Sequence, residues 1–313
     1  MSKVNKLLPL IGLLLFIIII YSVGFSSILK TMSEINLKYF LIAFLFTVPS
    51  LIIKTVKWNI FVKKFAKVSF IKLLKVWWLG FGIGIFTPGR LGDFSKAYFL
   101  RKELSIGKGL LTVFLDRVID IISLLFLGLL SAIVLFNSLN FVFIAGFLII
   151  FLIIALSLAR NEKLTEKFLK PGFLLFVPEK YKEKAKKHFA DIYKAYKKIG
   201  SKEILENVIL TLAAWFFVFI QYYFLSIAFN LNFSFSFLCF AIPFILVIQS
   251  LPISFSGFGT REGVAIVTLG IAGISAEKAI SYSLGIWVMD AILGLVGILV
   301  SFFIFEKKLY AKK

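Results

Sequence analysis

Two short stretches, Thr87-Pro88-Gly89-Arg90-Leu91-Gly92-Asp93 and Ser256-Gly257-Phe258-Gly259-Thr260-Arg261-Glu262, place proline, glycine and opposite charges inside strongly apolar sequence. Isolated charges are costly within a lipid bilayer, and backbone broken by glycine or proline cannot face lipid there. Such segments are tolerated at membrane depth only where protein surrounds them or where they line a water-filled cavity. We therefore expect both stretches to lie inside the protein and to mark its functional centre.

The composition around these stretches is that of a membrane protein. Hydrophobic residues make up 60% of the 313-residue chain, which contains 38 phenylalanines, and the mean hydropathy is +0.98. Soluble domains are only about one half apolar, so the sequence predicts a single all-α polytopic membrane domain over residues 1–313. Leu7 to Gly24 is long for a signal peptide and lacks a clear cleavage site, so we interpret it as the first span.

The net charge of +20 reports membrane topology rather than nucleic-acid binding. The lysines crowd between apolar segments, and the sequence shows no basic soluble module or recognition motif. Because cytoplasmic loops carry an excess of lysine and arginine, this bias places both termini on the cytoplasmic side of the cell membrane. The clusters predicted to be cytoplasmic are Lys3 with Lys6, Lys54 to Lys75, Arg90 to Lys108, Arg160 to Lys202 and Lys307 to Lys313.

Apolar runs of about 20 residues are long enough to cross a bilayer as helices. Such runs predict about six spans, near residues 7–24, 39–56, 110–136, 141–159, 207–229 and 279–303. Two apolar regions remain, residues 73–100 and 235–274, and the charge bias puts both ends of each region on one side of the membrane. We expect each to form a re-entrant helical hairpin, and the two hairpins to enter from opposite faces.

The two hairpin regions show signs of an internal repeat. Ser105-Ile106-Gly107-Lys108 and Ser275-Ala276-Glu277-Lys278 each precede a long span at an offset of 170 residues, and the same offset carries Asp120 onto Asp290. Inverted repeats with broken helices near the bilayer midplane are typical of alternating-access transporters. Chance similarity between glycine-rich apolar segments is the alternative. The predicted repeat units, of opposite orientation, are residues 73–136 and 235–303.

Several charged side chains fall within the predicted spans. Asp116 and Asp120 are four residues apart and share a helix face, and Arg117 can pair with Asp120. Asp290 lies near mid-membrane, where an unpaired carboxylate is strongly disfavoured. We expect Asp116 and Asp290 to act in ion pairs or in proton coupling; the alternative is that such pairs only hold the two hairpins together. The candidate partners of Asp290 are Arg90, Arg117 and Arg261.

Glycine next to arginine in both hairpins indicates an anion site. Gly257 and Gly259 can expose backbone N–H groups at the start of a helix, and Pro88-Gly89-Arg90 can do the same. A guanidinium binds phosphate through two parallel hydrogen bonds, so a lipid phosphate is the expected ligand. The alternative is that glycine and proline only permit tight turns. Close helix packing is the role expected of Gly270 with Gly273 and of Gly294 with Gly297.

Enzyme functions find little support in the sequence. The only histidine, His188, falls in a lysine-rich segment, and H-E-x-x-H, Walker A and Rossmann patterns are absent. Cys239 is the only cysteine, so an intramolecular disulfide is excluded and a thiolate metal site is not expected. We predict no catalytic residues, no metal and no cofactor, and the enzyme alternative is a carboxylate-only intramembrane transferase.

Residues 160–202 form the one substantial polar segment, with twelve lysines and five acidic residues. We predict this segment to be cytoplasmic and helical. Its lysines can attract anionic lipid headgroups, each basic residue contributing on the order of 1 kcal/mol near such a surface. The alternatives are a solvated connector and a docking segment for a separate lipid or glycan synthase.

Three motifs resemble those of a known family. They are Pro88-x3-Gly92-Asp93-x2-Lys96, Asp116-Arg117-x2-Asp120 and Leu251-Pro252-Ile253-Ser254-x-Ser256-Gly257-x-Gly259-x-Arg261-Glu262-Gly263. Together they resemble the transmembrane, flippase-like domain of the lysylphosphatidylglycerol synthetase family, and the resemblance extends over most of the chain. The third motif is the most specific. The first departs from the family pattern, because Asp93 and Lys96 stand where glutamate and arginine are more typical, and this departure bears on headgroup specificity.

The resemblance implies a stand-alone lipid translocator without the cytoplasmic synthetase domain of bifunctional members. Its expected partners are membrane lipids, either an anionic phospholipid or a polyprenyl-phosphate-linked lipid. A membrane scaffold for a separate synthase and an intramembrane transferase are the alternative functions. By resemblance the site positions are Arg90, Asp93, Arg117, Asp120, Arg261 and Glu262, and Lys96, Gly257 and Gly259 complete the predicted substrate-binding set.

Overall fold

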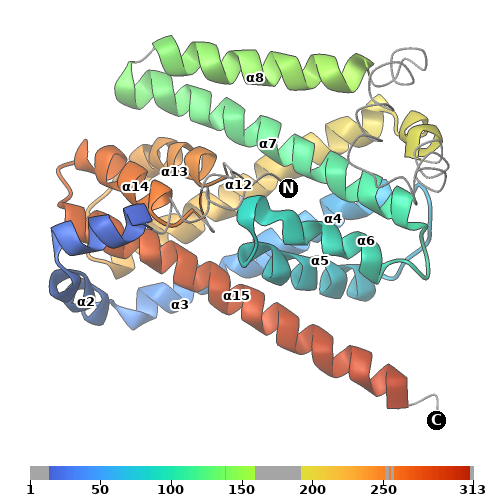
Figure 1. Cartoon of the computed structure of the whole chain (residues 1–313), viewed down its shortest axis with the longest axis horizontal. Helices are drawn as coiled ribbons and strands as arrows, with labels where there is room; N and C mark the ends of the chain where they lie inside the picture. The colour runs from blue at the N-terminus through green and yellow to red at the C-terminus, as the bar shows by residue number, and fades with distance from the viewer. Residues whose placement is uncertain (1–13, 138, 159–191, 251–253, 255–256, 311–313) are drawn as a thin grey trace.

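The protein, seen here as a computed structural model, is all-helical, which confirms the predicted all-α multi-pass class (Figure 1). The structure describes residues 14–137, 139–158, 192–250, 254 and 257–310, and no strand occurs within these ranges. Its elements are α2 (Phe25–Ser33), α3 (Leu37–Leu45), α4 (Thr47–Val62), α5 (Phe70–Ile85), the 3-10 turn η1 (Pro88–Phe94), α6 (Ser95–Phe99), α7 (Ile106–Phe136), α8 (Leu139–Leu158), α12 (Ser201–Ala228), α13 (Phe235–Ser250), α14 (Thr260–Gly270) and α15 (Ala276–Tyr310).

Some of the predicted features lie outside the described residues. The first predicted span is described only from residue 14, and the lysine-rich segment only from residue 192. His188 and the start of the third motif, residues 251–253, also lie outside the described ranges. The predictions for these positions stay predictions.

Within the described residues, four helices are long and apolar enough to cross a membrane. They are Leu37–Val62, which joins α3 and α4, Ile106–Phe136 in α7, Ser201–Ala228 in α12, and Ala276–Ser301 in α15. These helices correspond to four of the predicted spans, and α12 packs along both α3 and α4. They form the frame of the bundle that holds the charged side chains described below.

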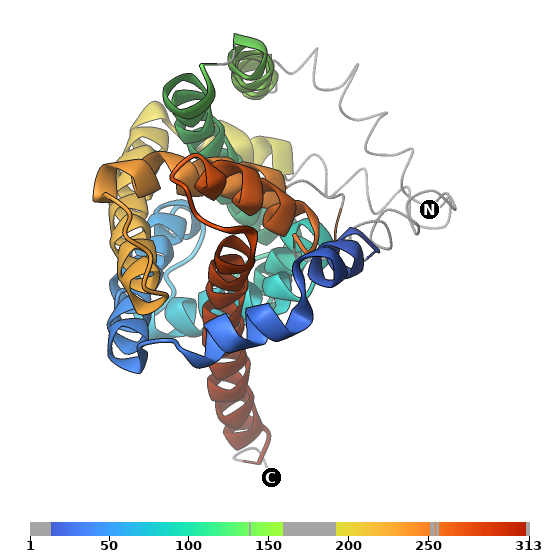
Figure 2. The same cartoon turned by 90° about the vertical axis from the view of Figure 1, so that its left-hand side faces the viewer.

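The two remaining predicted spans take other forms. The helix Leu14–Val23 and α2 count as one span only if they cross as a bent pair, because the chain turns through 81° between them. The bend falls at Gly24, whose φ of 97° favours glycine. The predicted span 141–159 corresponds to α8, whose apolar stretch Leu139–Ala155 is shorter than a full span. Figures 1 and 2 show α8 alongside α7 at the edge of the bundle.

Helix α4 extends further than the apolar run predicted. We expected the span to end at residue 56 and a cytoplasmic lysine cluster to begin at Lys54, but α4 continues to Val62. Lys54 and Lys57 therefore lie within the helix, and Lys57 is fully buried. The prediction fails here because carboxylates on α7 compensate the buried ammonium of Lys57. Lys63 is the first exposed lysine of the cluster.

Both predicted hairpin regions consist of a helix, a break and a second helix that packs back on the first. Residues 73–100 fold as α5, η1 and α6, and residues 235–274 contain α13 and α14. Before α14, Gly257 and Gly259 adopt φ values of 84° and 80°, a backbone conformation that glycine permits. Their insertion into a bilayer as re-entrant hairpins stays a prediction.

The two hairpins pack reciprocally on the two long helices. α5 lies against α15 and α13 lies against α7, while α6 contacts α7 and α14 contacts α15. A Cβ added to Gly82 of α5 would lie 2.4 Å from the backbone oxygen of Gly294, so glycine permits this close approach. The expected packing role is confirmed for Gly294 and Gly297, which face α5. It is wrong for Gly270 and Gly273 as far as the described residues go, since none of these lies within 4 Å of a Cβ at either position.

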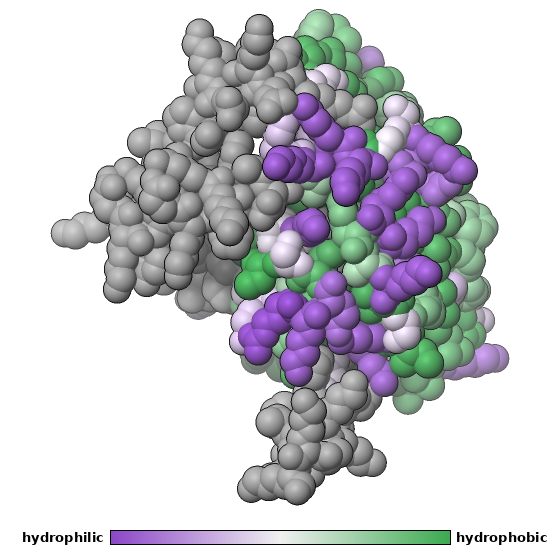
Figure 3. Space-filling model, turned by 90° about the vertical axis from the view of Figure 1, so that its right-hand side faces the viewer, coloured by the Kyte–Doolittle hydropathy of each residue, from purple (hydrophilic) through white to green (hydrophobic). Residues whose placement is uncertain are grey.

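Hydrophilic side chains gather on the face at the right-hand end of Figure 1, which Figure 3 views directly. Lys64 in the α4–α5 loop lies 2.5 Å from Glu203 at the start of α12. Lys72 at the start of α5 pairs with Glu103 in the α6–α7 loop. The described parts of three predicted basic clusters therefore share one face, and its cytoplasmic orientation stays a prediction.

Candidate functional site

A cavity of about 220 Å³ lies between α4, α5, η1, α7, α12, α13 and α15. Its charged lining consists of Lys54, Arg90, Arg117, Asp120 and Asp290. Aromatic side chains, among them Trp77, Phe81 and Trp215, form part of the remaining wall. Four residues of the predicted site therefore meet around one cavity, although they are distributed over 200 residues of sequence.

Arg90 reaches the last helix from the turn of the first hairpin. Its Nη2 lies 3.3 Å from Oδ2 of Asp290, and the two side chains are 37% and 14% exposed. Gly89 and Arg90 adopt φ values of 58° and 55°, and this left-handed backbone is unfavourable for arginine. The Thr87 hydroxyl holds the turn by accepting a hydrogen bond of 2.7 Å from the Gly92 N–H. Of the three candidate partners of Asp290, Arg90 is the one that pairs with it.

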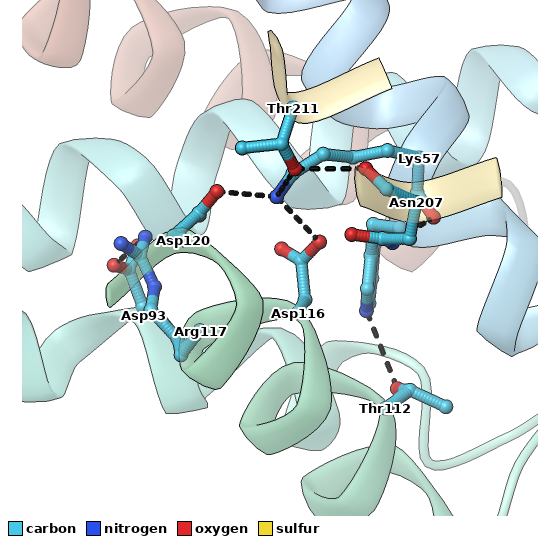
Figure 4. Close-up of polar contacts among 9 residues, drawn as sticks. Lys57, Asp93, Thr112, Asp116, Arg117, Asp120, Asn207 and Thr211 are labelled. Carbon is cyan, nitrogen blue, oxygen red and sulfur yellow. Dashed lines mark hydrogen bonds and ion pairs between the residues drawn. The ribbon is translucent and has the colours of Figure 1, made fainter. Parts of the chain in front are cut away.

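Arg117 is shared between the cavity and a buried carboxylate (Figure 4). Its Nη2 pairs with Asp93, which lies in η1 and is fully buried. The predicted pairing of Arg117 with Asp120 does not form, because the Asp120 carboxylate is engaged by Lys57. Basic residues from different helices can pair with the same carboxylates. The spacing of residues along α7 therefore cannot show which of these pairs forms.

Lys96 lies behind this pair and is not part of the cavity lining. Its side chain is fully buried, and its Nζ has no hydrogen-bond partner among the residues described. The ammonium lies 5.5 Å from the ring centroid of Trp58 and 5.3 Å from that of Trp77. Such cation–π contacts offset part of the cost of desolvating the charge. The structure places Lys96 against these rings rather than at the cavity surface.

A buried network beside the cavity joins α4, α7 and α12 (Figure 4). Lys57 Nζ lies 3.1 Å from Asp116 Oδ1, 2.5 Å from Asp120 Oδ1 and 3.3 Å from Thr211 Oγ1. Asn207 donates a hydrogen bond of 2.9 Å to the Lys57 carbonyl oxygen. The predicted shared face of Asp116 and Asp120 is confirmed, and Lys57 is their common partner. Lys57 is absent from the predicted site because a lysine that follows an apolar run is interpreted as part of a cytoplasmic loop.

Lys54 is a second residue absent from the predicted site. It lines the cavity, and within the described part of the chain it has neither a hydrogen bond nor an ion pair. Thr47 and Ser50 line the cavity as well, so a polar stripe at spacing i, i+3, i+7 follows one face of α4. This helical spacing of polar residues inside a span is the sequence signal that identifies Lys54.

Arg261 and Glu262 of the second hairpin lie outside the cavity lining, and both are fully buried. Arg261 Nη2 lies 2.5 Å from Glu262 Oε1, and Ser283 of α15 accepts a hydrogen bond of 2.8 Å from Arg261 Nε. Glu262 Oε2 accepts a hydrogen bond of 2.8 Å from the Gly259 N–H, which caps α14. These contacts lie within the second hairpin and between α14 and α15, so they hold that hairpin on α15 but do not join it to the first hairpin. They also engage the Gly259 amide that we expected to face an anion.

Gly257 lies one contact away from the cavity. A Cβ added to it would lie 2.6 Å from Cγ of Gln249, which is part of the lining. Gly257 therefore positions a cavity side chain without reaching the cavity itself. Among the residues described, no group of three or more histidine, cysteine, aspartate or glutamate side chains is arranged to hold a metal ion.

Comparison with known proteins connects this geometry to a family. The family profile described as the lysylphosphatidylglycerol synthase TM region matches residues 7–297. The chain is 24% identical to UPF0104 membrane protein MJ1595 of Methanocaldococcus jannaschii, over 95% of this chain and 96% of that protein. It is 33% identical to UPF0104 membrane protein PH1989 of Pyrococcus horikoshii, over 37% of this chain and 36% of that protein. No solved structure matches the chain significantly.

Proposed function

Because the chain belongs to the family of the lysylphosphatidylglycerol synthase TM region, we propose that it is a lipid translocator. Its substrate is a phospholipid or a polyprenyl-phosphate-linked lipid, which it moves between the leaflets of the cell membrane. The proposal treats the cavity as a binding site and assigns no chemical transformation to it. The distribution of lysine supports an orientation with both termini in the cytoplasm.

The observation that carries the proposal is that charged side chains from both proposed repeat units, residues 73–136 and 235–303, line one cavity. Arg90 comes from the first hairpin, Arg117 and Asp120 from α7, and Asp290 from α15. Ionisable groups inside a membrane protein are costly and typically mark a substrate or ion pathway. Arginine is well suited to bind a phosphate oxygen there.

The size of the cavity supports binding of a headgroup rather than of a whole lipid. Its volume of about 220 Å³ is below the range of roughly 300–1,000 Å³ that is common for drug-sized ligands. The acyl or polyprenyl tails then stay in the bilayer while the phosphate occupies the polar cavity. This division keeps the apolar part of the substrate in lipid and the charged part among compensating side chains.

The reciprocal packing of the hairpins supports alternating access. Each hairpin lies on the long helix that follows the other hairpin, through α5 against α15 and α13 against α7. This arrangement is expected of an inverted repeat, in which rocking of one unit against the other exposes a central site to each side in turn. In our proposal residues 73–136 and 235–303 are these two units.

Leaflet exchange in liposomes tests the proposal. Purified protein is reconstituted with fluorescent anionic phospholipids or polyprenyl phosphates, and the fraction of label accessible to an external quencher is followed with time. We expect exchange in wild type, a loss of at least about tenfold in Arg90→Gln and Arg117→Gln, and no change in the exposed control Lys67→Gln. Equal exchange in all four proteins would show nonspecific scrambling. Absence of exchange in wild type with every lipid tested would overturn the proposal.

A further inference from the structure

Lys54 differs from the other charged residues that line the cavity, because each of the others already has a charged partner. Lys54 has no hydrogen bond and no ion pair with any residue described, although it is part of the lining. An ammonium group in a largely apolar environment is costly unless an anion compensates it. The partnered residues are Arg90 with Asp290, Arg117 with Asp93, and Asp120 with Lys57.

The formal charges around the cavity leave one positive charge in excess. Five basic side chains, which are Lys54, Lys57, Arg90, Lys96 and Arg117, face four carboxylates, which are Asp93, Asp116, Asp120 and Asp290. Two of the five basic groups, Lys54 and Lys96, have no ion pair with a carboxylate of the described ranges. Lys96 is fully buried against Trp58 and Trp77. Among the residues that the structure describes, Lys54 is therefore the cation without an ion pair that a ligand in the cavity can reach.

The surroundings of Lys54 are suited to a phosphate group of low charge. Ser50 on the same face of α4 lines the cavity with a hydroxyl group. Thr47 and Thr211 line it too, but their hydroxyls already donate to the carbonyl oxygens of Phe44 and Asn207. Hydroxyls can donate hydrogen bonds to phosphate oxygens. Asp120 and Asp290 line the same cavity and repel additional negative charge. A phosphodiester carries one negative charge, whereas a phosphomonoester carries about −1.5 to −2 at neutral pH.

We infer that Lys54 is the principal anion-binding residue of this cavity and that its ligand is a singly charged phosphodiester. The inference rests on the proposed lipid transport for its biological meaning, and it narrows the substrate to a phosphodiester lipid. Arg90 and Arg117 then contribute secondary contacts while they remain in their ion pairs. Because Lys54 makes no hydrogen bond or ion pair with any described residue, its replacement leaves the pairs Arg90–Asp290, Arg117–Asp93 and Lys57–Asp120 in place.

Calorimetric titration of the detergent-solubilised full chain tests this assignment. The probes are dihexanoyl phosphatidylglycerol, a phosphodiester, dihexanoyl phosphatidic acid, a phosphomonoester, and inorganic phosphate. The proteins are wild type, Lys54→Gln, Lys54→Arg and the control Lys38→Gln, which changes an exposed lysine of α3. Thermal unfolding of each variant verifies that it is folded. We expect the phosphodiester to bind best, its affinity to fall at least about tenfold in Lys54→Gln, and Lys54→Arg and Lys38→Gln to bind nearly as wild type.

Each other result overturns part of the inference. Unchanged affinity in a folded Lys54→Gln protein, or no binding of any probe to wild type, would remove Lys54 as the anion site. Tighter binding of the phosphomonoester or of inorganic phosphate would reject the ligand class. Lys54-dependent binding without leaflet exchange would overturn the proposed transport and keep the anion site. Normal leaflet exchange in Lys54→Gln would overturn the anion site and keep the proposed transport.

Discussion

Arg90 and Asp290 are separated by 200 residues in sequence, and their side chains lie 3.3 Å apart in space. This ion pair connects the turn of the first hairpin to the last long helix, across the cavity that both residues line. Because Arg90 adopts a left-handed backbone conformation with φ 55°, the turn directs its side chain at some conformational cost. A strained residue whose ion pair joins the first hairpin to α15 is a position at which we expect a conformational change.

Removing both members of this pair should separate its structural role from its transport role. Arg90→Gln leaves the Asp290 carboxylate without its partner, so we expect a lower unfolding temperature than in Arg90→Gln/Asp290→Asn. The coupling is expected to be about 0.5–3 kcal/mol, the range for contacting residues. Leaflet exchange should remain low in the double variant. Exchange at the wild-type rate in that protein would show that the pair contributes only to folding.

The buried Lys57 should be among the most sensitive positions for stability. Lys57→Met leaves Asp116 and Asp120 without their common cation, and uncompensated buried charge typically costs about 3–5 kcal/mol. Thermal unfolding in detergent measures the loss, with Lys63→Met at the exposed end of α4 as the matched control. Adding Asp116→Asn and Asp120→Asn should recover part of it. A Lys57→Met protein as stable as wild type would contradict the network in Figure 4.

Replacement of Glu262 should affect the fold more than lipid transport. Glu262→Ala removes the cap on the Gly259 N–H and the carboxylate that balances the buried Arg261, with an expected cost of about 3–5 kcal/mol. The combination Arg261→Met with Glu262→Gln should restore much of this stability, because no charge then remains uncompensated. Both unfolding temperature and leaflet exchange are measured. If Glu262→Gln kept full stability and lost exchange, the substrate-binding role predicted from sequence would be supported instead.

The contact between α5 and α15 depends on glycine. In Gly82→Ala the new Cβ would meet the Gly294 carbonyl oxygen, which is backbone and cannot rotate away. We expect a loss of about 1–3 kcal/mol, typical of overpacking. Gly146→Ala in α8 is the control, because its Cβ would have ordinary contacts only, the nearest atom lying at 3.9 Å. That change should be neutral or stabilising by up to about 1 kcal/mol. Equal unfolding temperatures for the two variants would argue against the packing described.

Lys96 should tolerate replacement by methionine. Its buried ammonium has no hydrogen bond within the described part of the chain, so Lys96→Met removes a desolvated charge and keeps a side chain of similar length. Asp93 retains its pair with Arg117. We expect an unchanged or raised unfolding temperature, compared with Lys102→Met at an exposed position. A fall comparable to that of Lys57→Met would mean that Asp93 depends on Lys96.

Local sequence was sufficient to predict the membrane class, most of the long helices and four of the five charged residues that line the cavity. These features follow from the length of apolar runs and from the cost of an isolated charge in lipid, and both can be evaluated along the chain. Arg90, Arg117, Asp120 and Asp290 stand inside apolar sequence, so their presence requires an explanation in any fold. Lys54 lies close to a lysine-rich loop in the sequence, so the positive-inside rule assigns it to the cytoplasmic loop rather than to the cavity.

What the sequence determined by itself is that this is an all-helical membrane protein with two broken, charged segments and buried ion pairs. Only the tertiary structure decided which charges pair, that Lys57 binds Asp116 and Asp120, and that the Arg261–Glu262 pair lies outside the cavity. The reason is physical. The free-energy cost of burying a charge can be judged from the residue and its immediate neighbours in the sequence. Which opposite charge offsets that cost depends on side chains from distant parts of the chain, which helix packing brings within a few ångströms.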